Sequence, residues 1–408
     1  MRITFLTHYF PPEVGAPQTR IDLLARTLAA RGDQVTVHTG FPHYPDGEIP
    51  APYRNRAWQR EERDGITVVR SAVYPTANRG FARRLADHTA FALSALMTAP
   101  AAPAADVVVG ESPPLFTGAA GAMYARLKGA AYVLNVADLW PASAVELGAL
   151  TDRRAIAAAT ALERWMYARC DRIVAPTEGI VRRLAEEPAA AGRAHRLWPV
   201  VDIDRFAAAG ATTSGRAPLR LLFAGTVGLA HGLEVLVAAS RLAGPEVVQT
   251  TIAGDGADAP RVRVAIGELG ATNVEMLGAL PADRIPALYA THDAAAVLLR
   301  DLTLFEGALP TKLLEAMAAG RPVVLAARGE SARLVAQARC GITVAPGDAE
   351  ALAGALRRLH ADPALAGALG WAGRRYAEEH FGAQRAAAAW AAQISDAAGA
   401  RRRARSRA

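Results

Sequence analysis

The sequence predicts an α/β protein built from two Rossmann-like domains, each with a parallel β-sheet. The 408 residues exceed what a single core usually holds, and length divided by about 150 gives two or three domains. In both halves, short apolar runs that are typical of buried parallel strands alternate with longer segments of helical periodicity. Between the halves, residues 197–215 accumulate Gly, Ala, Thr and Ser, which favours a domain boundary there.

The first strand is predicted at residues 3–7 and the first helix at residues 18–30, where apolar side chains recur on one face. The loop between them contains Gly15, which would let the backbone approach a ligand closely. An ordinary turn glycine explains Gly15 equally well. The loop lacks the G-x-G-x-x-G pattern, so we expect no dinucleotide cofactor.

Asp138 is the candidate catalytic residue of the first half. It directly follows a predicted buried strand at residues 132–136, and the carboxyl ends of such strands face the ligand in open α/β sheets. Its carboxylate can accept the proton of an acceptor hydroxyl, whereas capping of the next helix is the structural alternative. Glu111 and Glu146 are weaker candidates for the same role. Residues 40–47, rich in Pro, Gly and aromatic residues, form a long loop of a kind that is usually functional.

Residues 79–97 combine a basic start with an apolar helical run. Arg79, Arg83 and Arg84 precede Phe91-Ala-Leu-Ser-Ala-Leu-Met. This pattern is typical of a core or interdomain helix, and it also suits a helix that lies on a membrane surface. Both interpretations remain open at this point.

The second half begins with a predicted strand at residues 219–223, followed by a glycine-rich loop. Gly225 and Gly228 would allow a phosphate to approach the backbone at the start of the next helix. His231 is the only cationic candidate in this loop.

The central stretch of the sequence lies between predicted strands at residues 294–299 and 322–326. Pro310 suits the first turn of the intervening helix, and the free N–H groups of this turn, Thr311 included, favour an anion. Lys312 adds a full positive charge where Asp or Glu is usual, and a bound phosphate would explain it. Arg300 is a second candidate cation. Glu315 could accept hydrogen bonds from vicinal hydroxyls, although an ordinary solvated helix is the alternative explanation.

The run Glu315-Ala-Met-Ala-Ala-Gly-Arg-Pro-Val-Val resembles the signature of the GT4 family of retaining glycosyltransferases. The resemblance implies the GT-B fold, in which two Rossmann-like domains face each other across a cleft. It also implies a pair of glutamates spaced E-x7-E that binds the nucleotide sugar, with Glu315 as the second. The first departs from the pattern, because position 307 is Gly307 and Glu306 comes one residue early. Sugar recognition is the step that this difference affects.

Further motifs resemble the exopolysaccharide and O-antigen branch of the family, which includes colanic-acid and L-fucosamine transferases. They are spread over the first half: Tyr9-Phe-Pro-Pro-Glu-Val-Gly-Ala, Thr39-Gly-Phe-Pro-His-Tyr-Pro-Asp-Gly, Ser112-Pro-Pro-Leu-Phe and Asp138-Leu-Trp-Pro. By this resemblance, the backbone at Leu277 and Gly278 would read the nucleobase. A C-terminal helix at about 376–395, with Trp390, would pack back on the first domain.

We therefore expect an acceptor domain at 1–200, a nucleotide-sugar donor domain at 205–375 and a basic disordered tail at 396–408. Arginines of that tail supply most of the net charge of +7. A weaker interpretation of the tail is attraction to anionic lipids, and without a recognition motif we expect no nucleic-acid partner.

The remaining composition limits other classes of function. Two isolated cysteines form no disulfide framework or metal site. The longest uncharged stretch, residues 89–105, contains two prolines and is shorter than the roughly 20 residues of a membrane span. We expect a cytoplasmic protein without a signal peptide, with possible contact with the inner membrane surface. Zinc spacing, a P-loop and a usable D-x-D motif are absent from the sequence, so we expect a metal-independent enzyme without a cofactor.

The preferred interpretation is a retaining glycosyltransferase that uses a UDP-sugar and a glycan or lipid-linked acceptor. Three alternatives remain open: a UDP-sugar 2-epimerase of the same fold, transfer to a small-molecule natural product, and a catalytically silent partner subunit. The resemblance implies an Arg and a Lys in the glycine-rich loop that neutralise the diphosphate, and this sequence has neither. This difference and Gly307 favour the last of these alternatives.

Overall fold

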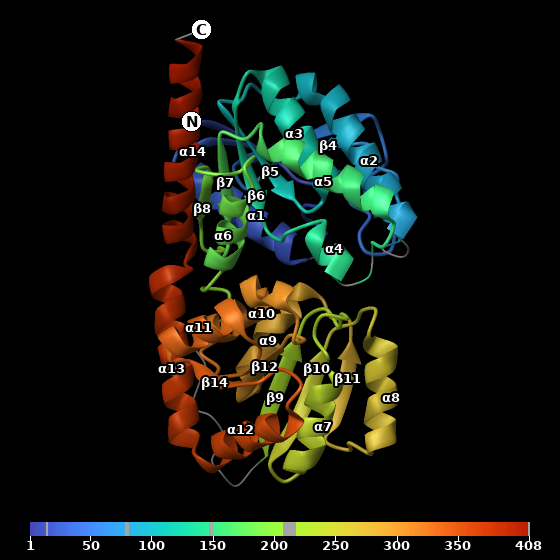
Figure 1. The fold of residues 1–408 in the computed structure, drawn as a ribbon, viewed down its shortest axis with the longest axis vertical. Helices are drawn as coiled ribbons and strands as arrows, with labels where there is room; N and C mark the ends of the chain where they lie inside the picture. Colours follow the sequence, from blue (N-terminus) through green and yellow to red (C-terminus); the bar gives the residue numbers. More distant parts are fainter. Residues whose placement is uncertain (14, 78–80, 147, 149, 207–217, 407–408) are drawn as a thin grey trace. The chain divides into compact units, whose positions relative to one another are not determined.

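The computed structural model describes the chain except for residues 14, 78–80, 147, 149, 207–217 and 407–408. It divides into two compact units, one formed by Met1–Val200 with Ala383–Ala408 and the other by Val201–Gly382. Each unit is built around one β-sheet with helices on its faces (Figure 1). The prediction of two Rossmann-like α/β domains with parallel sheets is confirmed.

The sheet of the first unit has the strand order β3-β4-β2-β1-β5-β6-β7-β8. Neighbouring strands of this sheet pair in parallel, except that the edge strand β3 pairs antiparallel with β4. The central strand β5 is buried at every position, as a parallel strand covered on both faces must be. The strands are β1 Arg2–Leu6, β2 Gln34–Gly40, β3 Trp58–Arg63, β4 Ile66–Ser71, β5 Val107–Ser112, β6 Ala131–Val136, β7 Arg172–Ala175 and β8 Ala194–Arg196.

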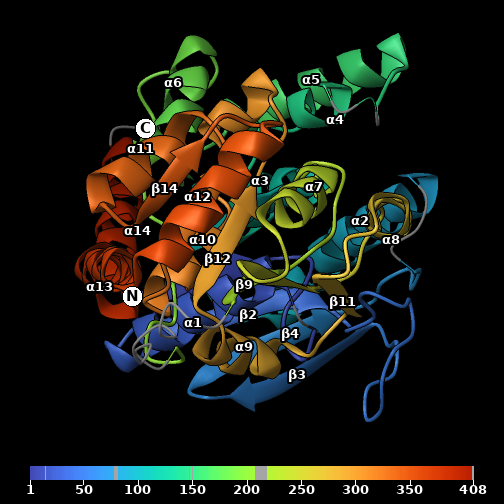
Figure 2. The ribbon, with the colours of Figure 1, turned by 90° about the horizontal axis from the view of Figure 1, so that it is seen from below.

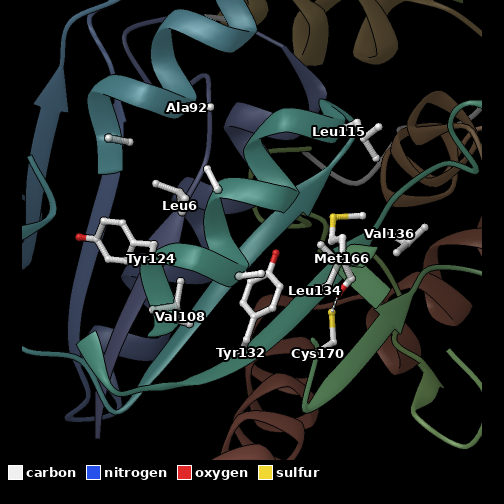
Figure 3. Close-up of a cluster of buried hydrophobic side chains, with 14 of the residues drawn as sticks. Leu6, Ala92, Val108, Leu115, Tyr124, Tyr132, Leu134, Val136, Met166 and Cys170 are labelled. Atoms are coloured by element: carbon white, nitrogen blue, oxygen red, sulfur yellow. Dashed lines mark hydrogen bonds between the residues drawn. The ribbon is translucent and has the colours of Figure 1, made fainter. Parts of the chain in front are cut away.

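Two hydrophobic clusters cover the two faces of this sheet. Helices α1 and α14 contribute to one cluster, and α2, α3 and α5 contribute to the other. Figure 3 shows part of the second cluster, where Tyr132 and Met166 pack under α3 and the Cys170 thiol donates to the Met166 carbonyl (3.3 Å). The helices are α1 Ala16–Ala30, α2 Phe81–Met97, α3 Leu115–Lys128, α4 Ala142–Glu146, α5 Arg153–Tyr167, α6 Glu178–Glu186, α14 Ala383–Arg405 and the short η1 Ala99–Ala101.

The C-terminal helix differs from the sequence-based expectation at both ends. It begins at Ala383 instead of about 376, and its Trp390 is buried against α1 and the first sheet. It continues to Arg405, so the expectation of a disordered tail from residue 396 is wrong for residues 396–405. Ala397 and Ala398 are buried in the same hydrophobic cluster as Trp390. Their burial stabilises the helix directly before the arginines that begin at residue 401, and the helix continues through them. Positions 407 and 408 lie outside the described residues.

Helix α2 is amphipathic. Phe91, Ala92 and Ala95 are buried in the core, whereas Leu93 and Met97 are exposed on the opposite side. The helix is therefore part of the domain core, and its outer face remains available to a partner. Among the described residues, no helix combines the length and the apolar character that a membrane span requires.

The sheet of the second unit has the order β11-β10-β9-β12-β13-β14, with all pairs parallel. Helices α7 and α12 pack side by side on one face of this sheet, and α9 lies on the other (Figure 2). The strands are β9 Leu219–Ala224, β10 Val248–Ala253, β11 Val274–Gly278, β12 Ala294–Leu298, β13 Val323–Ala326 and β14 Gly341–Val344. The helices are α7 Glu234–Ala243, α8 Ala259–Leu269, α9 Ile285–Thr291, α10 Thr311–Ala318, α11 Gly329–Ala338, α12 Ala349–Ala361 and α13 Pro363–His380, with the short η2 Ala282–Arg284 and η3 Thr303–Gly307.

Candidate functional site

The candidate site of the second unit lies where the strand order reverses. Strand β9 is followed by β10 on one side, whereas its other neighbour, β12, is followed by β13. Open α/β sheets bind ligands at such a switch point, outside the carboxyl ends of the strands. The glycine-rich loop after β9 and the first turn of α10 meet here, because Lys312 lies beside Gly225.

Helix α10 begins directly after Pro310, close to the place where the sequence predicts its first turn. Pro310 is its N-cap, with extended backbone, and Thr311 is its first residue. The fixed φ of proline and its missing N–H suit this end of a helix. At the other end, Gly320 adopts a φ of 66° just after the C-cap, as expected for a left-handed residue past a helix end. The N–H groups of Thr311 and Lys312 thus lie at the end of α10 that meets the glycine-rich loop, whereas the N–H of Leu313 donates to the Pro310 carbonyl (3.0 Å).

Lys312 is buried in this first turn, with 9% of its surface exposed. Its Nζ lies 3.9 Å from the centroid of the Phe223 ring and 3.2 Å from Nε2 of His231. Burial lowers the pKa of Lys312 to about 7, while Glu315 acts in the opposite direction. A lysine kept in apolar surroundings gains most when an anion binds beside it.

His231 is neutral in this arrangement. Its Nδ1 lies 3.0 Å from the Leu298 carbonyl and must donate to it, so Nε2 is left to accept from Lys312. Burial, with the nearby Lys312, lowers the pKa of His231 to about 4. The expectation that His231 supplies a positive charge is therefore wrong. Its role in donor binding stays a prediction, with His231 as a partner that orients the Lys312 ammonium group.

Glu315 lies one turn further along α10 and is half-buried. Burial raises the pKa of Glu315 to about 7, although Arg205 and Lys312 both act to lower it. Tyr289 fixes this part of the helix, because its hydroxyl donates to the Lys312 carbonyl (3.3 Å). A carboxylate in such a place is costly unless hydroxyl or cationic partners surround it, and it is suited to accept from a bound diol.

Two glycine loops pack directly against each other beside Lys312. Gly225 has a φ of 125° and Gly254, after β10, has a φ of 153°. A Cβ on Gly254 would lie 1.9 Å from the Gly225 carbonyl oxygen, so no side chain fits there. Gly228 has no such restriction, because a Cβ added there would come no closer than 3.7 Å to another atom, the Thr226 side chain. Gly225 is therefore required by the local backbone, whereas Gly228 is not.

Arg300 lines a cavity of about 290 Å³ beside this loop. Its guanidinium pairs with Glu234 (3.3 Å), which also pairs with Arg261. The charge of Arg300 is therefore partly offset before any ligand binds, and Lys312 remains the stronger candidate partner for an anion. The cavity is lined by His231, Gly232, Glu234, Val235, Leu298, Leu299, Arg300, Asp301, Leu302, Ala326, Pro346 and Gly347.

Glu306 is exposed in the short helix η3, which ends at Gly307. Its backbone is held in place by Gly329, where a Cβ would lie 2.0 Å from the Glu306 carbonyl oxygen. The backbone of Glu306 is thus fixed against the start of α11, while its side chain is exposed. Whether Glu306 takes the place of the missing first glutamate stays a prediction.

Leu277 and Gly278 end strand β11 at the same sheet edge. Leu277 is 43% exposed, and Gly278 has a φ of 75° with open space around it. The pairing of β10 and β11 shifts register at this point, where Ala253 pairs with Gly278. Their backbone is accessible, as a contact with a nucleobase requires, and that contact stays a prediction.

In the first unit, Asp138 follows β6 at the carboxyl edge of the sheet and is exposed. Its Oδ1 accepts from the backbone N–H of Leu139 (2.8 Å), and it forms no ion pair among the described residues. Glu111, in contrast, is buried and accepts from Arg20, Asn135 and Thr7. The carboxylate of Glu111 is therefore occupied by protein partners, whereas that of Asp138 is accessible, and which of them takes the acceptor proton stays a prediction.

Gly15 is the N-cap of α1, with φ 172°. This is extended backbone that any residue can adopt, so conformation does not require glycine here. A Cβ would lie 2.4 Å from Oε1 of Gln18, but that atom is the end of a flexible side chain that can move aside, so space does not require glycine either. The approach of a donor to Gly15 stays a prediction.

Sequence reasoning missed two residues of the second unit. Phe223 lies under the Lys312 ammonium group, and Arg205 acts on Glu315 from the segment before β9. Phe223 is the last residue of the strand predicted at 219–223, and its place at the carboxyl end was the only available signal. Nothing in the sequence pairs Arg205 with Glu315.

Two family models match the chain, one for each unit. Residues 15–198 match the glycosyl transferase 4-like domain, and residues 218–362 match the glycosyl transferases group 1. The 2-deoxystreptamine glucosyltransferase of Streptomyces kanamyceticus is 32% identical over 289 residues, which covers 66% of this chain and 71% of that protein. The colanic acid biosynthesis glycosyl transferase WcaI of Escherichia coli (strain K12) is 25% identical over 341 residues, with 80% and 83% covered.

Solved structures share the whole fold. Sucrose-phosphate synthase from Thermosynechococcus elongatus superposes with a TM-score of 0.76 at 18% identity, and both chains are covered completely. Anabaena HepE, solved in complex with UDP-glucose, superposes with a TM-score of 0.69 at 18% identity, covering 97% of this chain and 99% of HepE. At 18% identity, these superpositions show a shared fold and nothing more about this chain.

Proposed function

We propose a reaction for this chain, which belongs to the GT4 family of glycosyltransferases and has the GT-B fold. In the proposal, it transfers a sugar from UDP, with retention of configuration, to a hydroxyl of a glycan or lipid-linked glycan precursor. The observation that carries the proposal is the buried Lys312 at the start of α10, beside a glycine loop at the switch point. This constellation fits a diphosphate better than any other ligand class.

On the donor side, we propose that fixed protein groups neutralise the negative charge of the diphosphate. Lys312 pairs with the diphosphate, and the first-turn N–H groups of α10 and the backbone at Gly225 bind its oxygens. Preorganised groups of this kind stabilise a leaving diphosphate without help from a metal ion. Glu315 accepts from the ribose hydroxyls. The UDP-glucose bound to HepE, a protein of the same fold, supports the choice of UDP.

The acceptor half assigns proton transfer to Asp138. Its exposed carboxylate at the carboxyl edge of the first sheet can take the proton of an incoming hydroxyl. The name of WcaI, which assigns that protein to colanic acid biosynthesis, supports a polysaccharide precursor as the acceptor. A small aminocyclitol is the second candidate acceptor, because the relative from S. kanamyceticus is named as a 2-deoxystreptamine glucosyltransferase.

A donor and acceptor panel tests this proposal. UDP-, GDP- and TDP-sugars are compared by thermal shift, and the preferred donor is then incubated with a polyprenyl-linked saccharide or with 2-deoxystreptamine. We expect stabilisation by UDP-sugars and transfer to the lipid-linked saccharide. Transfer to 2-deoxystreptamine alone would establish the second candidate. Stabilisation by GDP- or TDP-sugars instead would refute the choice of UDP.

The affinity for UDP should fall as the pH rises above about 7. Lys312 has a pKa of about 7 in the free protein, and a bound diphosphate raises it by providing a negative partner. Binding therefore takes up a proton above that pH, and the Kd increases by up to about tenfold per pH unit until the raised pKa is reached. Calorimetry in two buffers of different ionisation enthalpy measures the proton uptake between pH 7.5 and 9. A pH-independent Kd in this range would contradict a charged contact at Lys312.

A surface of the first unit suits contact with an anionic membrane. We use the name α2–α3 patch for the exposed side chains of Met97 on α2 and Leu127 on α3, together with the basic groups of Arg126 and Arg405. Its apolar part is strongly exposed, at 75% for Met97 and 65% for Leu127. Basic groups adjoin it, since Arg126 is exposed on α3 and Arg405 of α14 lies over Gly129 at the end of α3. Apolar side chains with cations at their edge are typical of peripheral membrane binding.

Replacing Met97 and Leu127 together by Ser should weaken binding to vesicles that contain phosphatidylglycerol by about tenfold or more. The reason is that each apolar side chain loses burial worth about 1.5–3 kcal/mol when fully inserted. Co-sedimentation measures the change, and Val264→Ser is the matched control, because Val264 is 56% exposed in the second unit. Equal binding of both variants, or binding that ignores lipid charge, would exclude this patch.

A further inference from the structure

A second cluster of polar side chains lies in the first unit, where neither half of the proposed reaction uses it. His8 follows β1, His43 follows β2, and Asp87 comes from the middle of α2. Oδ2 of Asp87 lies 2.9 Å from Nε2 of His8 and 3.0 Å from Nε2 of His43. The three ligand atoms all lie within 4.8 Å of one another.

The three side chains of the cluster are buried, and two of their polar atoms have no hydrogen-bond partner among the described residues. The three residues are 1–3% exposed. Nδ1 of His8 and Oδ1 of Asp87 are buried and have no hydrogen-bond partner among the described residues. Oδ1 of Asp87 belongs to the carboxylate that faces both imidazoles, and an unpaired buried oxygen there is costly and calls for an ion or another bound partner. Nδ1 of His8 is the ring nitrogen on the side away from Asp87, so an ion at Nε2 does not satisfy it.

The orientation of His43 is fixed from outside the cluster. Its Nδ1 lies 2.9 Å from the Phe41 carbonyl, an acceptor, so Nδ1 carries a proton. In the neutral ring, Nε2 then has a lone pair 3.0 Å from Oδ2 of Asp87, and two acceptors at that distance need a cation that they share, either a proton or a metal ion. A backbone carbonyl that holds the far nitrogen of an imidazole is the usual support of a metal-binding histidine.

Charge also favours a cation. Glu13 lies next to the cluster and accepts from the backbone N–H groups of Phe10, His43 and Tyr44, with one carboxylate oxygen 3.8 Å from Nδ1 of His43. Asp87 and Glu13 thus place two buried carboxylates around two imidazoles. A divalent ion supplies positive charge that balances these carboxylates.

We propose that His8, His43 and Asp87 bind one divalent transition-metal ion of the Zn²⁺ class. Two imidazoles and a carboxylate suit Zn²⁺ or Co²⁺ and are a poor match for Mg²⁺ or Ca²⁺. Ligand atoms about 2.0–2.1 Å from a tetrahedral ion lie roughly 3.3 Å apart. The observed 2.9 and 3.0 Å are within a few tenths of that spacing, and the two imidazole nitrogens lie within 4.8 Å of each other, so the side chains must shift to admit the ion. The ion joins the loops after β1 and β2 to α2 and has a structural role.

The experiment loads metal-free protein with Zn²⁺ or Co²⁺. We expect one equivalent of Zn²⁺ to bind, a higher melting temperature with Zn²⁺ than with EDTA, and a Co²⁺ absorption spectrum of a low-coordinate site. His8→Gln and Asp87→Asn should each lower the Zn²⁺ affinity by more than about 100-fold, because loss of a ligand exceeds the 10–100-fold effect of losing a supporting contact.

His195→Gln is the matched control, because it removes a histidine of the same unit that lies outside the cluster. It should leave Zn²⁺ binding unchanged. A hydrogen-bonded cluster without metal would show no stoichiometric binding by the parent protein, a result that does not depend on how well the variants fold. That result, or Zn²⁺ binding retained in both ligand variants, would overturn the proposal.

Discussion

Replacing Lys312 by Ala should weaken UDP binding roughly 10- to 100-fold, because it removes a charge-assisted contact worth about 1.5–3 kcal/mol. The surroundings of Lys312 support an effect of this size. Its ammonium group lies over Phe223 and beside the neutral His231, so no carboxylate competes with the diphosphate at hydrogen-bond distance among the described residues. Isothermal titration calorimetry of the parent and the variant measures the difference.

Uridine and a second variant make this prediction specific. Uridine has no phosphate, so Lys312→Ala should bind it as well as the parent does. Glu315→Gln should weaken uridine and UDP together, because its proposed partner is the ribose that both contain. If Lys312→Ala binds UDP with unchanged affinity, the cationic role passes to Arg300. Arg300 would then have to separate from Glu234, with which it is paired in the structure.

Much of the second unit could be predicted from local patterns. The apolar runs before and after residues 300–320 define β12 and β13, and Pro310 places the start of α10 within one residue. These signals are local because the physical constraints on helix ends and buried strands act over a few residues. The position of Lys312 and Glu315 on one helix followed directly.

Contacts between distant segments could not be predicted in this way. The neutral state of His231 depends on the Leu298 carbonyl 67 positions away, and Glu234 offsets Arg300 over 66 positions. The cluster of His8, His43 and Asp87 joins residues 79 and 44 positions apart. The helical end of the chain was missed for the same reason, because its stability comes from burial of Ala397 and Ala398 against the first sheet. Sequence spacing carries no signal for such pairings.

Replacing Asp138 by Asn should lower the turnover by about 100-fold or more and leave UDP affinity unchanged, because a general base contributes about 10²–10⁴-fold. Asn is the informative replacement. Its side-chain oxygen can still accept from the Leu139 N–H, the contact that Oδ1 of Asp138 makes in the structure (2.8 Å), so the loop after β6 is kept. The variant therefore removes the basic carboxylate and little else.

Asp152→Asn provides the matched control for Asp138. Asp152 is also an exposed carboxylate of the first unit that accepts from a backbone N–H, that of Ala155 at 2.8 Å, and it serves as the N-cap of α5. Its replacement should leave turnover within about twofold, because Asn caps helices as well as Asp does. Steady-state kinetics with the preferred UDP-sugar compare the two variants. If Asp138→Asn also keeps its turnover, Asp138 has a structural role and the proton passes to another exposed carboxylate, with Glu146 on α4 the next to test.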